Sequence, residues 1–453
     1  MVAPPANRFD KPTGKPKIGQ LDGQLSVIDT VGGGIMTTKS LGQIYGGVIM
    51  VRNNETDNAS LTLWNITVMP EDKGQGALNG ALIYPSTGTS LTIKDCMLLN
   101  GVSTGKGGAI HAVEGSTVEI SGTTIMSCTA AGNGGAISGA ATSTISITDS
   151  QIIGCSSDLD GGSIYSNGTV SIKNSKLLGG TAGNCGGNVI QSSGQLTVDN
   201  CELAYGSCHG EYGQSTTSTA DNYGGGTLTL KGATMIGLHN NGLDLNTSPG
   251  AIDASGLTAG AEIFVEANGV FTKTGANKDY FKPALRTGEI TVDETTGGLK
   301  AVQVADGQLG GYCPHCYDPK DPKRVVWNAF GSETNKGGCD ENHNLYDGHW
   351  YMNVNTGWVY SLNEGVDFVL DLNGKSMTIS NRIFNIKGNN SSLSILDSVG
   401  NGYLTAKGTA TPAPGGVIYG DRVGYTLNIY GGRIAYLEGR TVNYRTRRQC
   451  SLQ

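Results

Sequence analysis

The chain has 453 residues, 71 of them glycine, with only 15% charged residues and a formal net charge of −7. This charge argues against a nucleic-acid partner, which requires a basic stripe, and no apolar run approaches the 18 residues of a membrane-spanning helix. The ten cysteines are too few and too scattered for a small disulfide scaffold. The high share of glycine and the low share of charged residues lead us to expect many short strands joined by turns.

The first segment, residues 1–20, reads MVAPPANRFDKPTGKPKIGQ and lacks the charged-then-apolar pattern of a signal peptide. We interpret it as a flexible leader. If the protein is exported, its signal is expected upstream of this sequence or has been lost from it.

An internal repeat occupies residues 21–245. A triplet that alternates apolar, polar and apolar residues, as a strand requires, recurs at intervals of 30, 27, 27, 25, 26 and 32 residues. These intervals fit neither paired-helix repeats nor propeller blades. The triplets begin at Leu61, Leu91, Val118, Ile145, Val170, Leu196 and Leu228.

Each triplet is followed by a residue that tolerates a left-handed backbone, then by a mostly small residue that we expect at an inward corner, and then by an apolar residue of a second strand. The turn residues are Asn65, Asp95, Gly122, Asp149, Asn174, Asn200 and Gly232. The corner residues are Ile66, Cys96, Thr123, Ser150, Ser175, Cys201 and Ala233. The apolar residues are Val68, Leu98, Ile125, Ile152, Leu177, Leu203 and Met235.

A "GGAI" segment supplies a third strand, with Ile49, Ile83, Ile110, Ile137, Ile164 and Ile190 in one column. Three short strands with bends between them form one triangular coil, and successive coils stack in parallel about 4.8 Å apart. The sequence therefore predicts an all-β fold, a right-handed parallel β-helix with about 27 residues per coil.

The strings "GGAIHA" at 107–112, "GGAISG" at 134–139 and "GGSIYS" at 161–166 resemble the repeats of pectin-lyase-like β-helix proteins, notably the polymorphic outer-membrane and autotransporter passenger families. The resemblance covers about residues 45–300 and implies architecture more than chemistry. The period fades over residues 246–308, which resemble the cap that ends such arrays in secreted proteins of gut Firmicutes.

A cysteine- and histidine-rich connector spans residues 309–356. Cys313 and Cys316 form a Cys-x2-Cys pair, with His315 between them, and Cys339 and His343 follow as Cys-x3-His. These spacings suit a closed structural zinc site. A disulfide or unligated thiols are equally compatible, and a catalytic metal is disfavoured because it needs an open coordination position. The connector also resembles those that introduce further β-helix domains in clostridial surface proteins.

Residues 357–453 restart the coil pattern with a longer period, so we expect a second, truncated β-helix. No cap is visible in the sequence after about three coils. Since an uncapped end is an open strand edge that invites pairing, we expect the parent protein to be longer.

An outward-facing column follows the "GGAI" isoleucines: Met50, Tyr84, His111, Ser138, Tyr165 and Gln191. Aromatic rings at coil spacing offer apolar area and a polar group to an extended sugar chain, so Tyr84, His111 and Tyr165 are the candidate glycan-binding residues. The alternative is a solvated strand face. We expect His111 to be an exposed strand residue without a catalytic role.

Acidic residues are the candidates for enzymatic chemistry. The resemblance implies that enzymes of this fold use clustered carboxylates, often with Ca²⁺ and a basic residue. Asp149, Asp158 and Asp160 lie within one coil, and Lys173 and Asp199 follow. Turn formation accounts for these aspartates, so we assign no catalytic residue.

We therefore expect a monomeric, secreted or cell-surface protein that binds a polysaccharide or a host or cell-surface glycan, as an adhesin would. The alternatives are a polysaccharide lyase or glycoside hydrolase, with Ca²⁺ as its cofactor, and a purely structural spacer.

Overall fold

The structure is a computed structural model that describes most of the chain. The described residues are 24–38, 47–52, 59–71, 77–191, 193–208, 220–222, 226–237, 242–245, 252–284, 287–303, 308–312, 324–330, 338–352, 354–380, 382–397, 402–406, 416–420, 422–436 and 451–452. Within these ranges the regular structure is strand apart from one short 3-10 helix, η1 (Lys278–Tyr280), and no helix is long and apolar enough to cross a membrane.

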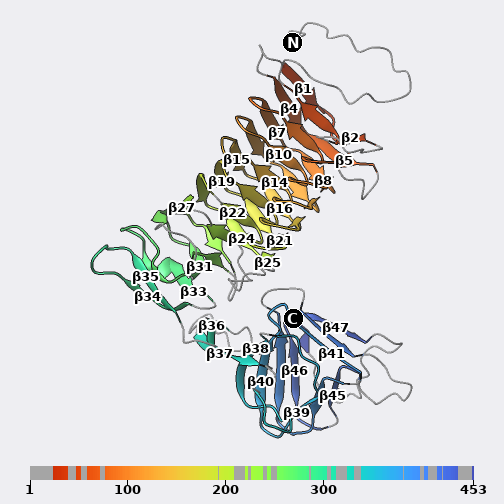
Figure 1. Cartoon of the computed structure of the whole chain (residues 1–453), viewed down its shortest axis with the longest axis vertical. Coiled ribbons are helices and arrows are strands. Elements are labelled where there is room, and N and C mark those ends of the chain that lie inside the picture. Colours follow the sequence, from red (N-terminus) through yellow and green to blue (C-terminus); the bar gives the residue numbers. More distant parts are fainter. Residues whose placement is uncertain are drawn as a thin grey trace.

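The alternating triplets form one nine-stranded sheet of the first β-helix (Figure 1). Val118 pairs in register with Leu91 on one side and Ile145 on the other, and the pairing is parallel throughout the column. The strands are β1 (Gln24–Ile28), β4 (Ser60–Trp64), β7 (Ser90–Lys94), β11 (Thr117–Ser121), β15 (Thr144–Thr148), β19 (Thr169–Lys173), β23 (Gln195–Asp199), β27 (Thr227–Gly232) and β30 (Asp253–Leu257).

The turn column is confirmed at every predicted position. All seven residues from Asn65 to Gly232 have φ between 50° and 63°, the left-handed region that Asn, Asp and Gly adopt at least cost. Short polar side chains at this place also bond from coil to coil: the Asn174 amide donates to Asp149 Oδ1 (3.1 Å), and the Asn200 amide donates to Asn174 Oδ1 (2.9 Å).

The second and third strands of each coil belong to an 18-stranded sheet. The second strands include β5 (Ile66–Pro70), β8 (Met97–Leu99), β12 (Thr124–Met126), β16 (Gln151–Ile153), β20 (Lys176–Leu178), β24 (Glu202–Ala204) and β28 (Met235–Ile236). The "GGAI" strands are β3 (Ile49–Val51), β6 (Ile83–Pro85), β10 (Ile110–Ala112), β14 (Ile137–Gly139), β18 (Ile164–Ser166) and β22 (Val189–Gln191).

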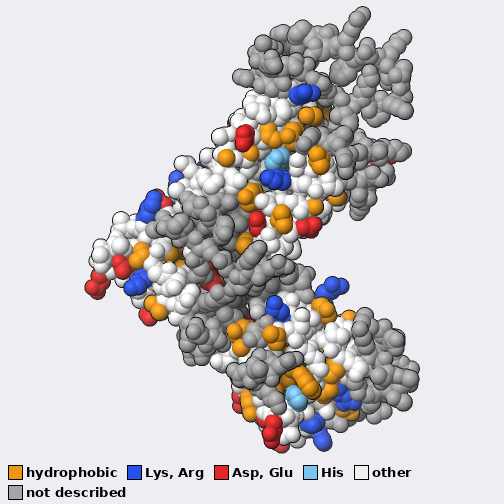
Figure 2. All heavy atoms as spheres, in the orientation of Figure 1, with side chains coloured by type: hydrophobic (Ala, Val, Ile, Leu, Met, Phe, Trp, Pro, Cys, Tyr) orange, Lys and Arg blue, Asp and Glu red, His pale blue; other side chains and the backbone are white. Residues whose placement is uncertain are grey.

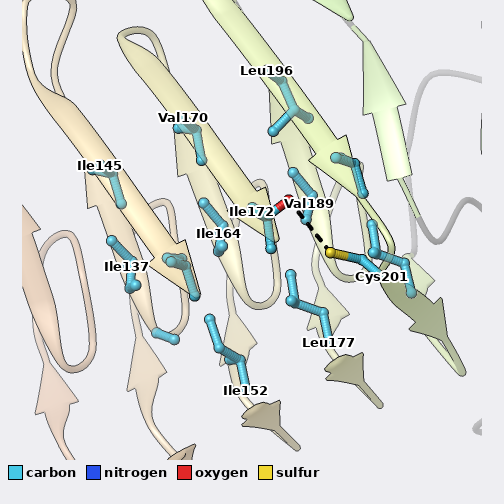
Figure 3. Packing of buried hydrophobic residues seen from close by; sticks show 14 of the residues in the cluster. Ile137, Ile145, Ile152, Ile164, Val170, Ile172, Leu177, Val189, Leu196 and Cys201 are labelled. Atoms are coloured by element: carbon cyan, nitrogen blue, oxygen red, sulfur yellow. Dashed lines mark hydrogen bonds between the residues drawn. The ribbon is translucent and has the colours of Figure 1, made fainter. Parts of the chain in front are cut away.

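The core lies between these strands. Ile110, Ile137 and Ile164 pair in register and are fully buried. Figure 3 shows Ile137, Ile145 and Ile152, one from each strand type, turned toward a common interior. Stacking like side chains in this way lets every coil cover the apolar residues of its neighbours, which a single coil cannot do.

Two register predictions are wrong. Ile164 pairs with Val189, so Ile190 lies opposite Tyr165, and Gln191 lies opposite Ser166. The reason is that the left-handed glycine of each "GG" pair fixes where the strand begins, and "GGNV" at 186–189 is the true equivalent of "GGAI".

The second error concerns the last regular coil. Met235 is exposed and the inward position belongs to Ile236, which pairs with Leu203. The corner is Thr234, whose hydroxyl accepts a hydrogen bond from the Cys201 N–H, and not Ala233. One extra residue after the turn at Gly232 shifts both positions by one.

Five of the coils also contain a short strand that the sequence did not reveal. β9 (Val102–Ser103), β13 (Thr129–Ala130), β17 (Ser156–Ser157), β21 (Thr181–Ala182) and β25 (Ser207–Cys208) form a five-stranded sheet. Two residues are too few to show an alternating pattern.

The first array continues through β26 (Ala220–Asn222), β29 (Leu243–Asp244), β31 (Glu262–Glu266) and β33 (Phe281–Pro283), and ends beside the antiparallel strands β32 (Gly269–Val270), β34 (Thr287–Val292) and β35 (Leu299–Gln303).

A second unit with its own core follows, built from three sheets. The largest contains β36 (Gln308–Tyr312), β37 (Arg324–Phe330), β38 (Gly348–Met352), β40 (Asp367–Asp371), β43 (Ser392–Leu396), β46 (Thr426–Ile429) and β48 (Ser451–Leu452). The others contain β39 (Tyr360–Leu362), β42 (Phe384–Ile386) and β45 (Ile418–Gly420), and β41 (Ser376–Ile379), β44 (Tyr403–Ala406) and β47 (Arg433–Tyr436). Apart from β36 with β37, the described pairings in this unit's sheets are parallel. The fold is thus the all-β solenoid, a parallel β-helix followed by a second one, that the sequence predicts.

Candidate functional site

The outward column on the "GGAI" strands brings the predicted residues into one row. His111 on β10 lies beside Ser138 on β14, and Ser138 lies beside Tyr165 on β18, all in register. Tyr84 on β6 precedes them, and its ring lies 5.9 Å from the His111 ring, tilted by 47°. Three aromatic side chains therefore follow the β-helix axis, and one small residue interrupts them.

A hollow of about 340 Å³ lies at this interruption. His111 and Tyr165 line it from two coils, and the coil between them contributes only small residues: Ser138, Gly139, Ala140 and Ala141. Two coil steps of about 4.8 Å separate the strands that carry the rings by roughly 10 Å. The hollow exists because the middle coil places no large side chain between them.

The lining is completed by the apolar Val113 and by the charged and amide groups of Lys106, Glu114 and Asn167. The Lys106 N–H donates to Asn79 Oδ1 (2.6 Å), and the Ser103 hydroxyl donates to the Lys106 carbonyl (3.2 Å). These bonds hold the turn that carries the ammonium group beside the hollow. Figure 2 shows histidine and basic side chains next to each other on this face of the first β-helix.

His111 is not the exposed strand residue that we expected. Burial, helped by the positive charge of Lys106, lowers its pKa to about 4, although the Ser138 backbone opposes the shift. Its Nδ1 atom is buried and has no hydrogen-bond partner among the described residues. The imidazole is therefore neutral at pH 7, and Nδ1 is not accessible to a ligand.

The structure thus brings His111 and Tyr165 to one hollow and places Tyr84 against His111. Sequence reasoning missed Lys106, Glu114 and Asn167, which come from loops. A signal was present for Lys106: the residue before the left-handed glycine is Asn133 and Asp160 in the next two coils, and Lys106 breaks that pattern.

A column of acidic residues was not predicted from the sequence, because the repeat period fades after β27. Asp221 on β26, Asp244 on β29 and Glu266 on β31 lie in register on three consecutive strands. The side chains of Asp244 and Glu266 are buried, 4% and 2% exposed. Adjacent buried carboxylates are stabilised by sharing a proton, by hydrogen bonds or by a cation.

Two aspartates of the regular coils take part in local structural contacts. Asp149 has the left-handed backbone of the turn column, and Asp199 forms an ion pair with Lys173 at 3.8 Å. Asp160 is half-buried, and burial raises the pKa of its carboxyl group.

Of the predicted zinc ligands, only Cys339 and His343 lie within the described residues. Cys313, His315 and Cys316 lie outside the described residues, whereas Cys339 is buried in the core of the second unit. The His343 ring stacks on Trp358 at 4.8 Å. Among the described residues no group of three or more His, Cys, Asp or Glu side chains is arranged to hold a metal ion, and the zinc site stays a prediction.

No protein-family model matches the chain, and no curated protein matches its sequence. The solved structure of a PL6-family alginate lyase, a single-substitution variant of AlyGC, is similar over 91% of this chain and 77% of that one, with 10% sequence identity and a TM-score of 0.16. Similarity at this level carries no argument about what this chain does. The β-helix assignment rests on the chain's own strand pairing.

Proposed function

We propose that the protein is a secreted or cell-surface glycan-binding protein that holds a polysaccharide or host-cell glycan along the outer face of its first β-helix. The observation that carries the proposal is the hollow between His111 and Tyr165. It combines two aromatic side chains with an ammonium, a carboxylate and an amide group, the mixture of apolar faces and hydrogen-bonding groups that orients a small polar ligand.

The direction of the aromatic row supports an extended ligand. Tyr84, His111 and Tyr165 follow one another across the strands, along the stacking direction of the coils. A chain of sugar rings lying along this axis would place one ring in the hollow and the next ring toward Tyr84.

The state of His111 favours binding over catalysis. Burial lowers the pKa of His111 to about 4, which makes its imidazole a weak general base at neutral pH. The neutral ring instead offers an apolar face to a sugar. We also propose that the protein acts as a monomer.

The experiment is a glycan array probed with the full chain and with Tyr165→Ala and His111→Ala. We expect both substitutions to weaken binding of the same glycans by roughly tenfold, the loss of one good stacking contact. Tyr403→Ala, at an exposed tyrosine of the second unit, is the matched control and should leave those signals unchanged. Equal binding by Tyr165→Ala and the unsubstituted protein would refute the assignment.

A second candidate function, polysaccharide lyase or glycoside hydrolase, is favoured by the adjacent carboxylates of Asp244 and Glu266. Paired acids serve in glycoside cleavage. Release of unsaturated or reducing ends from a polysaccharide, abolished by Asp244→Asn, would place this function first.

A further inference from the structure

Trp358, in the second unit, leaves 57% of its surface exposed. It lies two residues before Tyr360, which is 2% exposed and begins β39. One face of the indole is covered, because the His343 ring stacks on it with centroids 4.8 Å apart and planes 20° from parallel. The indole therefore exposes a flat surface backed by a second ring.

The turn that carries His343 is firmly held. The His343 N–H donates to the Asp340 carbonyl (3.0 Å), and the His343 carbonyl accepts from the Ser361 N–H on β39 (2.9 Å). Both Asn342 and Asn344 donate their N–H groups to Asp340 Oδ1, at 2.9 and 2.8 Å. The stack is thus positioned by backbone bonds before any ligand arrives.

A third ring supports the stack from the core side. The Tyr360 ring meets His343 edge-on, 5.8 Å away at 74°, and its hydroxyl lies 3.1 Å from Thr356 Oγ1. A rigid aromatic surface loses little conformational freedom when it binds a ligand.

We propose that the Trp358–His343 stack is a separate carbohydrate-binding site that takes the apolar face of one uncharged sugar ring. The size of the surface points to such an occupant: besides Trp358, the exposed large hydrophobic residues described between residues 338 and 362 are Tyr346, Val354 and Val359, whereas a stable protein interface needs about 20–30 residues on each side.

The local charge selects among flat ligands. The Asp340 carboxylate accepts hydrogen bonds from the Asn342 and Asn344 N–H groups and from the Asn344 side-chain amide, and the exposed Glu341 lies between it and His343 in sequence. Anionic ligands such as nucleotides or acidic sugars are repelled by this pair. A neutral hexose or pentose polymer is not repelled by these carboxylates.

The test uses the full chain, titrated with neutral oligosaccharides (cellohexaose, mannohexaose and xylohexaose) in a calorimeter. We expect Trp358→Ala to weaken binding of at least one of them by roughly tenfold, and Trp358→Phe to retain part of the affinity. Trp64→Ala, at an exposed tryptophan of the first β-helix, is the matched control and should change nothing.

The proposal is independent of the hollow at His111, and the variants separate the two. Loss of neutral-sugar binding in Trp358→Ala but not in Tyr165→Ala supports it. It is overturned if no neutral oligosaccharide binds the unsubstituted protein, if Trp358→Ala and Trp358→Phe bind as tightly as that protein, or if Trp358→Ala changes the molar mass in light scattering without changing sugar affinity, which would assign the surface to a second copy of the chain.

Discussion

At the scale of single residues, the environment of His111 explains both its chemistry and a pH dependence. The side chain occupies an outward strand position, where solvent contact is the ordinary expectation. Neighbouring coils nevertheless bury it, and a lysine from the preceding turn disfavours its charged form. Sequence alone showed the residue and its column but not this burial, because burial depends on which loops fold over the strand.

This burial predicts that His111 makes the fold sensitive to mild acid. The pKa is about 4 when folded and about 6.5 when unfolded. Between these values the unfolded chain binds a proton that the folded chain does not, so the free energy of unfolding falls as pH drops through this window, by about 2 kcal/mol at pH 5. His111→Gln should remove that contribution, as measured by urea unfolding at pH 7 and pH 5. An NMR titration of His111 with a pKa near 6.5 would contradict the explanation.

At the scale of strands and turns, the turn column was predictable because only Asn, Asp and Gly adopt its backbone readily. The error at Ile190 arose because the left-handed glycine of the "GG" pair sets the start of the strand, and the error at Met235 arose because one extra residue follows the turn at Gly232. The hollow was beyond prediction from the repeat, since Glu114 and Asn167 belong to loops that differ from coil to coil. The column of Asp221, Asp244 and Glu266 was not predicted, because the repeat period fades in that part of the chain.

Two glycines with a left-handed backbone allow the stability cost of backbone strain to be measured apart from the cost of a steric collision. Gly134 has φ 76°, and a Cβ there would collide with the Ile137 carbonyl of its own coil, whereas Gly154 has φ 58° and nothing within 4 Å. We expect Gly154→Ala to cost about 1 kcal/mol from strain alone, and Gly134→Ala to cost at least about 3 kcal/mol. Equal urea midpoints for the two variants would show that the predicted collision is relieved without cost.

At the scale of the whole molecule, the described chain contains two large cores that share no residue. One extends from Ile49 to Ala301 and the other from Phe330 to Val417. The β-helix class followed from the repeat, because stacked coils need like residues at a fixed period. The division of the chain into five segments, and the zinc site within the connector, stay predictions.

Separate cores predict separate unfolding. Ile137→Ala should lower only one of two calorimetric transitions and Phe368→Ala only the other, each by about 2–5 kcal/mol of unfolding free energy. A single transition lowered by both substitutions would mean that the two units unfold together.

The most direct test of the central claim is a crystal structure of the full chain with a glycan selected on the array. We predict a sugar ring in the hollow between His111 and Tyr165, with Lys106, Glu114 or Asn167 hydrogen-bonded to its hydroxyl groups. A glycan bound on another face of the first β-helix, with the hollow unchanged, would contradict the proposed function.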